Sequence, residues 1–499
     1  MRSGRQLQGS CLFCGPEAHG LADHVLLRSD HFFLLAGPDP IVEGYLILAP
    51  HRCDQPDHPL HSFADVPPAL LDEVAFLRSL VSEFYRDLYQ QEASMHFECG
   101  RTEQLFPGSG STSRVGHANL CCYPRSLPLW EDLPGIKAEE IEGLHDLPWA
   151  AGDKPYLLIQ SSSIDQTLPP DSALRERWAS IIAPIEPSSL VSVPYLQQLL
   201  KLRLGEAGIS EQAPTTLVHK LVGDFQGWLR STTKYDLGTD PDGRVRLNYL
   251  KSVEQSNRIG NNSVAQDYHQ TWAGKLNYGA LGRFLSQLPE RRQERLQILD
   301  IGCGPGHYLK VFYALGFESI GIDVSEEMTG IARQVVGAAA ARSESAGATP
   351  LPQVETASLF DLQFADNSLD GIWYNAVVVH VPRRLLPANL ACLHRMLKQD
   401  GVLFLSALLG SGSVVRREGR VFFYYGPEEL EKFFDQAGFE TVSRWLSEID
   451  LSSRGGQRKK AWVNFLLRKK ARQLLPDSAL EDAGGVSRPR FKQEGHHGL

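Results

Sequence analysis

Apolar and polar positions follow two different patterns along this chain, and the change between them divides it into two parts. In the first part, short apolar runs are bounded by glycine and proline, which is typical of strands. Over residues 67–90 apolar side chains recur every three or four positions, which predicts one helix with a buried stripe. The strands predicted around this helix are 31–37, 44–50, 95–99 and 116–124.

The second part, from about residue 256, alternates strands with helices. This alternation predicts a parallel sheet with helices on both faces. Ser325, Glu326 and Glu327 favour a helix start, because serine caps a helix and acids suit its positive first turn. The predicted strands are 296–302, 318–323, 368–375, 401–409 and 462–467. The predicted helices are 384–398, 427–439, one that ends at Leu315 and one that starts at Ser325.

The pattern between these parts is weaker. It suggests a strand at 155–160, helices at 193–205 and 216–230, and a turn at 239–244. We therefore expect a first domain over 1–235, a linker over 236–255, a second domain over 256–470 and a disordered tail over 471–499.

Composition and charge exclude several classes of protein. Of the 499 residues, 42% are hydrophobic and 22% charged, which excludes a fibrous or wholly disordered chain. The net charge of −9 argues against bulk electrostatic attraction to nucleic acid or to an anionic membrane. The stretch from Arg454 onward carries a local +7, however, so contact with RNA stays open there. The sequence shows neither a membrane span nor a signal peptide, so we expect a cytoplasmic protein that does not enter membranes.

The strongest chemical signal is a glycine loop that follows the strand at 296–302. Gly302, Gly304 and Gly306 lack a Cβ, so the backbone can pass close to a ligand. The helix after the loop offers N–H groups to the same ligand. Asp323 ends the next strand, where a carboxylate can accept both hydroxyls of a ribose. A dinucleotide oxidoreductase is the competing interpretation, but its G-x-G-x-x-G pattern places the third glycine one residue later.

Four motifs resemble those of class I S-adenosylmethionine-dependent methyltransferases, over about residues 260–468. They are LDIGCGPG (299–306), GIDVSEEM (321–328), FADNSLDGIWYNAVVVHV (364–381) and LKQDGVLFLS (397–406). The resemblance implies an α/β Rossmann-like domain, a mostly parallel seven-stranded sheet with one antiparallel strand, and S-adenosylmethionine as cofactor.

The same resemblance assigns cofactor-binding roles by matched position. The three glycines would border the methionine and ribose parts, Asp300 would hold the loop or the amino group, and Asp323 the ribose diol. Ser358 stands where the family often has an acid that binds the adenine amino group, and Asp361 is a neighbour able to substitute. The remaining expected cofactor contacts are Val324, Met328 and Asn375.

Methyl transfer is an in-line displacement, so the protein chiefly aligns the reacting groups, and whether a general base also removes a proton from the acceptor stays open. Tyr374 and His380, after the fourth strand, are the candidate catalytic residues, with His380 either a base or a structurally satisfied histidine. Tyr268 and Trp272 could form a lid over the cofactor. Tyr424 and Tyr425 could contact the acceptor, although ordinary packing is the favoured interpretation.

Six of the eight cysteines lie in the first quarter of the chain. In this region CLFC (11–14), GYLILAPHRC (44–53), FECG (97–100) and GHANLCCYP (116–124) resemble the histidine-triad (HIT) nucleotide hydrolases and transferases, which implies an α+β fold. The family's nucleophilic histidine is matched by Asn119 and its third histidine by Cys121, so nucleotidyl transfer should be lost.

The same resemblance implies a structural zinc ion that is bound by Cys11, Cys14, Cys53 and His117. His51 is the rival ligand. The alternative is that the cysteines are reduced and bind no metal.

These observations leave more than one function open. The first is a methyltransferase with a small-molecule or nucleotide-bearing acceptor and a HIT-like domain in a structural or binding role. The others are a non-catalytic nucleotide-binding scaffold or sensor, and residual nucleotide hydrolysis by the HIT-like domain. The acceptor and the oligomeric state are not encoded in any motif.

Overall fold

The computed structural model describes most of the chain. The described residues are 13, 21–38, 40, 42–51, 60–100, 117–126, 138–141, 143–164, 176–184, 199, 202–203, 214–290, 294–342, 349–415, 419–449 and 460–470. The predicted helix at 193–205 lies largely outside these residues, and the predicted tail at 471–499 lies wholly outside them.

The first part of the chain forms a ten-stranded, largely antiparallel sheet. Its strand order is β6 (Glu139–Ile141), β8 (Glu176–Pro184), β7 (Tyr156–Ile164), β4 (Met95–Gly100), β5 (Leu120–Tyr123), β3 (Leu46–Pro50), β2 (Phe32–Ala36), β1 (Val25–Arg28), β10 (Val245–Leu247) and β9 (Leu237–Thr239). Helices α1 (Pro68–Tyr89) and α4 (Pro214–Ser231) pack together through Phe84 and Phe225, whose ring centroids are 4.9 Å apart. The strands predicted at 31–37, 44–50 and 95–99 and the helices predicted at 67–90 and 216–230 are confirmed.

The predicted linker at 236–255 is wrong. Residues 237–247 form the β9–β10 hairpin, whose turn at 240–244 carries the expected turn sequence, and β10 pairs in parallel with β1 through Arg28 and Arg246. Polar, turn-forming composition suggested a linker, but the pairing partner lies more than 200 residues away in the sequence and leaves no local signal.

The second part forms the expected seven-stranded sheet. Its order is β13 (Gln353–Thr356), β12 (Glu318–Asp323), β11 (Gln297–Ile301), β14 (Leu369–Tyr374), β15 (Leu397–Leu408), β19 (Lys460–Lys469) and β18 (Phe439–Ile449). The first five strands are parallel, and β19 is antiparallel to both neighbours. The sheet is thus mixed, with one reversed strand as the resemblance implied.

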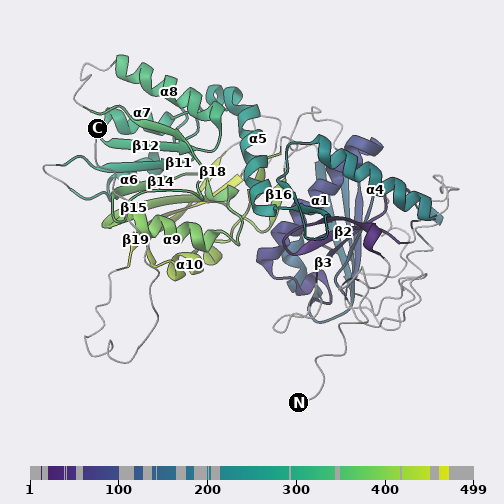
Figure 1. Ribbon diagram of the computed structural model, residues 1–499. Helices are drawn as coiled ribbons and strands as arrows, with labels where there is room; N and C mark the ends of the chain where they lie inside the picture. Colours follow the sequence, from purple (N-terminus) through teal and green to yellow (C-terminus); the bar gives the residue numbers. More distant parts are fainter. Residues whose placement is uncertain are drawn as a thin grey trace, which may run out of the picture.

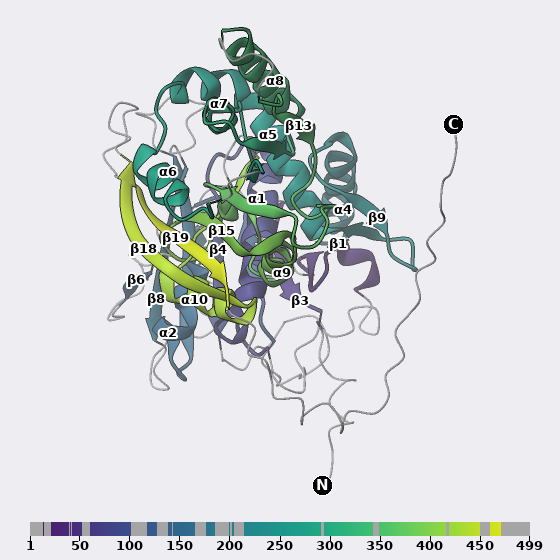
Figure 2. The same ribbon diagram turned by 90° about the vertical axis from the view of Figure 1, so that its left-hand side faces the viewer.

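Helices cover both faces of this sheet, with α6 (Tyr278–Leu285), α7 (His307–Ala314) and α8 (Glu326–Ala341) above, and α9 (Leu386–Met396) and α10 (Pro427–Gln436) below (Figure 2). Strand β14 illustrates the two layers, since successive side chains of a strand point to opposite faces. Trp373 packs against Phe284 of α6 and Phe312 of α7, whereas the Tyr374 hydroxyl donates to Asn389 of α9.

Helix α5 (Tyr249–Trp272) and the short strand β16 (Ser413–Val415) lie between the two sheets (Figure 1). Beside them, Asp72 of α1 is paired with Arg383, with Nη1 3.1 Å from Oδ1, and both side chains are almost fully buried. The two parts of the chain therefore meet through charged groups that are withdrawn from water.

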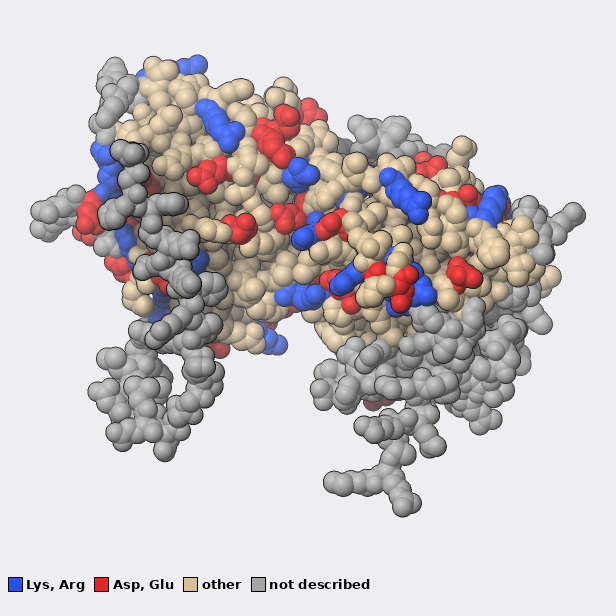
Figure 3. Space-filling model, in the orientation of Figure 1, with Lys and Arg blue, Asp and Glu red and all other residues tan. Residues whose placement is uncertain are grey.

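On the face shown in Figure 3, Lys and Arg are interspersed with Asp and Glu over the described residues. None of the helices in the described part of the chain is long and apolar enough to cross a membrane.

Candidate active site

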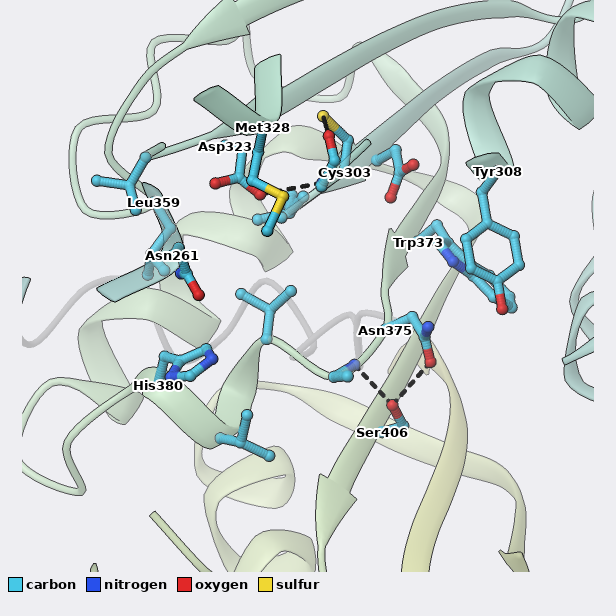
Figure 4. A pocket seen from close by; sticks show the side chains of 18 of the residues that line it. Asn261, Cys303, Tyr308, Asp323, Met328, Leu359, Trp373, Asn375, His380 and Ser406 are labelled. Atoms are coloured by element: carbon cyan, nitrogen blue, oxygen red, sulfur yellow. Dashed lines mark hydrogen bonds between the residues drawn. The ribbon is translucent and has the colours of Figure 1, made fainter. Parts of the chain in front are cut away.

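A cavity of about 630 Å³ opens at the carboxyl ends of β11, β12 and β14. Its size is within the range of small-molecule sites. Figure 4 shows Asp323 and Cys303 at one side of the cavity, Asn375 and Ser406 at another, and His380 at the end beside Asn261. The sequence-predicted residues that line it are Asp300, Gly302, Gly304, Asp323, Val324, Met328, Ser358, Asn375 and His380, with Tyr268 and Trp272.

The glycine loop has a left-handed backbone that favours glycine at three positions. Gly302 has φ +64°, and a Cβ there would lie 2.3 Å from Cγ2 of Val377. Gly304 has φ +51° and is open to the cavity, where a Cβ would first meet the Tyr268 ring at 4.0 Å. Gly306 does not line the cavity: a Cβ there would lie 2.9 Å from the Cβ of Ala332, so this glycine allows α7 to approach α8. The ligand contact expected at Gly306 stays a prediction, and the structure gives this glycine a packing role.

Asp323 ends β12 and holds the loop in place. Its Oδ2 accepts from the Gly304 N–H at 3.0 Å, and its Oδ1 accepts from the Ser325 N–H at 2.9 Å. Burial raises the pKa of this carboxyl, and the backbone N–H bonds oppose that rise. The next helix starts as predicted, because Ser325 Oγ accepts from the Met328 N–H at 3.1 Å.

Asp300, near the end of β11, is 2% exposed, and its Oδ2 has no hydrogen-bond partner among the residues that the structure describes. Burial raises its pKa well above the usual range, and the nearby charge of Asp323 raises it further. A buried acceptor without a donor is costly, so this oxygen is suited to a ligand that brings its own N–H groups.

At the other side of the loop, Val324 and buried Met328 give this end of the cavity an apolar wall. Ser358 also lines the cavity, and its Oγ accepts from the Phe360 N–H at 3.1 Å. Asp361 is exposed and does not line the cavity, so it does not take the place that the matched acid would occupy.

Asn375 is fixed at the end of β14 by a serine on β15. The Ser406 hydroxyl donates to Asn375 Oδ1 at 3.0 Å and accepts from the Ala376 N–H at 2.7 Å. Ala376 has φ +60°, which is unusual for a residue with a Cβ. Such strain persists only where the surrounding structure enforces it, and here it turns the chain sharply at the rim of the cavity.

His380 ends the short 3-10 helix η6 (Val378–His380) and lies against Phe422, with ring centroids 4.7 Å apart. Its Nδ1 is 2.7 Å from the carbonyl oxygen of Val421. A carbonyl only accepts, so Nδ1 carries the proton, and in the neutral ring the lone pair is on Nε2.

Tyr374 is excluded from the cavity, contrary to the prediction. Its side chain is fully buried and faces α9, where its hydroxyl donates to Asn389 Oδ1 at 2.9 Å. Burial raises the pKa of this phenol well above its usual range. Tyr424 and Tyr425 do not line the cavity either, and Arg383 lies 4.7 Å over the Tyr425 ring, which agrees with packing roles.

Several lining residues were missed from the sequence. They come from α5, from the strand β17 (Val421–Phe423) and the residue before it, and from the last two strands: Glu254, Asn257, Asn261, Arg420, Phe422, Ser447, Glu448, Trp462 and Asn464. Helix α5 is rich in Asn, Ser and Gln and has no strong apolar stripe, so periodicity did not reveal it.

Three of the four predicted zinc ligands, Cys11, Cys14 and Cys53, lie outside the described residues. The fourth, His117, is buried, and its Nε2 donates to the Pro50 carbonyl at 2.9 Å. Among the described residues there is no group of three or more metal-binding side chains. The amide of Asn119 donates to the His117 carbonyl at 2.8 Å.

Part of this chain is similar in sequence to known methyltransferases. Residues 272–444 match the family model described as "Methyltransferase domain". The "Ubiquinone biosynthesis O-methyltransferase" of Sinorhizobium medicae is 27% identical over 190 residues, which are 36% of this chain and 75% of that protein. The protein of the same name from Mesorhizobium japonicum is 27% identical over 35% of this chain and 72% of its own length.

Solved structures match at lower identity. An S-adenosylmethionine-dependent methyltransferase from Methanosarcina mazei is 22% identical, covers 36% of this chain and 94% of its own, and has a TM-score of 0.31. A Burkholderia thailandensis 1,6-didemethyltoxoflavin-N1-methyltransferase with bound S-adenosylhomocysteine is 17% identical, covers 48% of this chain and 95% of its own, and has a TM-score of 0.35.

The family model spans the glycine loop, Asp323 and strands β11 to β15, which are the parts that build the cavity. The named relatives are also similar to this chain over a comparable length. The second part of the chain is therefore a class I S-adenosylmethionine-dependent methyltransferase domain.

Proposed function

We propose that this enzyme transfers the methyl group of S-adenosylmethionine to a hydroxyl oxygen of a small aromatic acceptor. One observation carries the proposal: the bond from His380 to Val421 puts the lone pair of the neutral ring on Nε2. Supporting it, Phe422 and Trp462 line the same cavity as His380. The relatives at 27% identity bear the name O-methyltransferase.

The cofactor fits the residues at the other end of the cavity. Asp300 Oδ2, which is buried and has no partner in the described part of the chain, would accept from the amino group of the methionine part. Asp323, already oriented by two backbone N–H groups, has lone pairs left for the ribose hydroxyls. Met328 and Val324 would flank the adenine, with Ser358 nearby. Asn375, at the rim, would lie beside the methionine part.

When bound, the cofactor supplies an electrophilic methyl group on a sulfonium. His380 Nε2 would accept the proton of the acceptor hydroxyl while the oxygen forms its bond to the methyl carbon and the carbon–sulfur bond breaks. The electron pair of that bond stays on sulfur, so the products are a methyl ether and S-adenosylhomocysteine. The protein's contribution is alignment and removal of one proton.

A labelled-methyl assay tests this function. The full chain is incubated with tritiated S-adenosylmethionine and 3,4-dihydroxybenzoate or related catechols, and products are identified by mass spectrometry. We expect His380→Gln to lower kcat by about 10²-fold or more, since general-base catalysis typically contributes that much. The control is Tyr374→Phe, which changes a hydroxyl outside the cavity and should leave kcat within about threefold.

Two results would count against the proposal. If no hydroxyl acceptor takes up label although the cofactor binds, the acceptor class is wrong. If His380→Gln retains full activity on an accepted phenol, the base is another group.

We also propose that the first domain is HIT-like, lacks nucleotidyl transfer and binds one structural zinc ion through Cys11, Cys14, Cys53 and His117. Phe13, which directly precedes Cys14, is buried with its ring 5.3 Å from that of His117. The bond from His117 Nε2 to Pro50 leaves the lone pair of the neutral ring on Nδ1, and histidines that bind metals usually donate from their other nitrogen in this way. The rival ligand His51 donates from its Nε2 to the Phe32 carbonyl at 2.8 Å.

Metal analysis of the purified chain tests the zinc proposal. We expect about one zinc per chain, as in structural sites with four protein ligands. Cys14→Ser should lower that content, and Cys392→Ser, on α9 in the other domain, should not. A wild-type protein without zinc would end this proposal and leave methyl transfer untouched.

A further inference from the structure

Strands β16 and β17 form a hairpin whose outer edge faces both α5 and His380. Val415 is opposite Val421 in the antiparallel register, and the Tyr424 N–H donates to the Gly412 carbonyl. Hydrogen-bonded and non-hydrogen-bonded pairs alternate in such a ladder, so the N–H and C=O of Val421 point away from β16. They form an open strand edge that other groups must satisfy.

One side chain takes each of these two groups. The Val421 N–H donates to Oδ1 of Asn257 at 2.7 Å, and the Val421 carbonyl accepts from Nδ1 of His380 at 2.7 Å. Asn257 is 4% exposed and comes from the middle of α5. The hairpin thus connects α5 to the imidazole through the backbone of a single residue.

The hairpin also approaches α5 closely at its turn. Gly419 has φ +91°, and a Cβ there would lie 3.6 Å from the Ser256 carbonyl oxygen, one residue before Asn257. The turn and the Asn257 bond therefore fix the same strand against the same helix.

We propose that Asn257 is a positioning residue that holds His380 in the tautomer with its proton on Nδ1. This inference rests on the proposed role of His380 as the base. Anchoring the Val421 N–H keeps the Val421 carbonyl within reach of Nδ1, and the Nδ1 bond directs the lone pair of Nε2 to the acceptor. Asn257 does not touch the reacting atoms and acts through the strand.

The amide suits this role better than a carboxylate would. Both offer an acceptor to Val421, but a negative charge two hydrogen bonds away would favour the imidazolium, which cannot accept a proton. The charged side chains that already line the cavity around this end are Glu254, Arg420 and Glu448, which are common to all the variants compared.

The test is nitrogen-15 NMR of the full chain with labelled histidine, in which His380→Gln assigns the His380 signals. Wild type should show the Nδ1–H tautomer. Asn257→Ala should distribute the proton over both nitrogens and lower kcat on an accepted phenol by about tenfold or more. Asn257→Asp should keep the tautomer and raise the His380 pKa, which moves the acid limb of the pH–rate profile upward. The matched control is Asn261→Ala, one turn along α5 on the same cavity, which should leave the tautomer unchanged.

Binding of S-adenosylhomocysteine and thermal unfolding show whether each variant is folded. If Asn257→Ala does not fold, Asn257→Asp alone decides between a raised and an unchanged His380 pKa. A wild-type tautomer in folded Asn257→Ala, or an unchanged pKa in Asn257→Asp, would overturn the proposal. The NMR readout needs no turnover, so failure of the proposed methyl transfer is distinguishable from failure of the positioning role.

Discussion

At the scale of single residues, Asp300 shows how a buried carboxyl at the edge of a cavity can cost stability. Its buried carboxyl has an oxygen that no described residue hydrogen-bonds, and burial raises its pKa in the folded chain. The folded state therefore holds this proton at pH values where the unfolded chain has released it. Stability conferred by the protonated form is present at low pH and is lost as pH rises from the unfolded value toward the raised folded value.

We expect Asp300→Asn to stabilise the cofactor-free protein at about pH 7 by roughly 1–3 kcal/mol, the usual cost of an unsatisfied buried group. The gain should shrink toward about pH 3, below the usual aspartate pKa of about 3.9, where both states of the wild type are largely protonated. Urea unfolding at the two pH values measures this, and calorimetry should show weaker cofactor binding. Asp370→Asn is the contrast: Asp370 is equally buried but bonded to Lys398 and to the Gln297 N–H, so its change should destabilise. Equal stability of wild type and Asp300→Asn at both pH values would contradict this account.

The position of a residue could be predicted where a sequence motif fixes the backbone. It could not be predicted at the end of a strand, where neighbouring side chains point to opposite faces of the sheet. Asp323 and Gly302 follow from the loop itself, and both line the cavity. Tyr374 and Asn375 are adjacent in the sequence, yet one is buried against α9 and the other reaches the rim. Which of two neighbours faces a ligand depends on where a strand ends, and the sequence locates strand ends only to within a few residues.

At the scale of elements, the packing of the glycine loop can be tested by comparing alanine substitutions at two glycines, one in the loop and one in a helix. Gly302→Ala places a Cβ 2.3 Å from Val377 at φ +64°, so we expect a loss of more than about 2 kcal/mol in unfolding free energy and loss of cofactor binding. Gly330→Ala lies in helix α8 with no atom within 4 Å of the new Cβ, so it should be neutral or stabilising by about 0.5–1 kcal/mol. Denaturant unfolding of the two variants measures both effects. A mild effect at Gly302 would show that the loop is more adaptable than its packing indicates.

Some helices and strands could be predicted from the sequence, whereas others could not. The buried parallel strands β11, β12, β14 and β15 read as apolar runs, because both of their faces are covered. Helix α5 packs with polar residues against several neighbours, and the β9–β10 hairpin exists because β1 provides a pairing partner. Elements that depend on distant partners carry little local pattern.

At the scale of the whole molecule, Arg383 connects the two domains three residues after His380. Its guanidinium bonds both oxygens of Asp72 on α1, Glu429 on α10 and the carbonyl of Tyr424 beside the hairpin. Burial alone would raise the Asp72 pKa, but His145 and Arg383 lower it below its usual value. Asp72 and Arg383 are 311 positions apart, so no spacing rule could pair them. Through this ion pair the first domain directly contacts the segment that carries the proposed base, His380.

We expect Asp72→Ala to destabilise the full chain by about 3–5 kcal/mol, because it leaves a buried guanidinium short of a partner. Because the folded-state pKa of Asp72 is lowered, its stabilisation is present above the unfolded value and is lost as pH falls through the folded value. The deficit of Asp72→Ala should therefore shrink in acid. The matched control is Glu428→Ala, which removes an exposed partner of Arg444 and should change stability by less than about 1 kcal/mol. Denaturant unfolding at neutral and acid pH, followed by tryptophan fluorescence, measures the free energy of unfolding of both variants. If Asp72→Ala lowers it no more than the control does, the ion pair does not stabilise the contact between the domains.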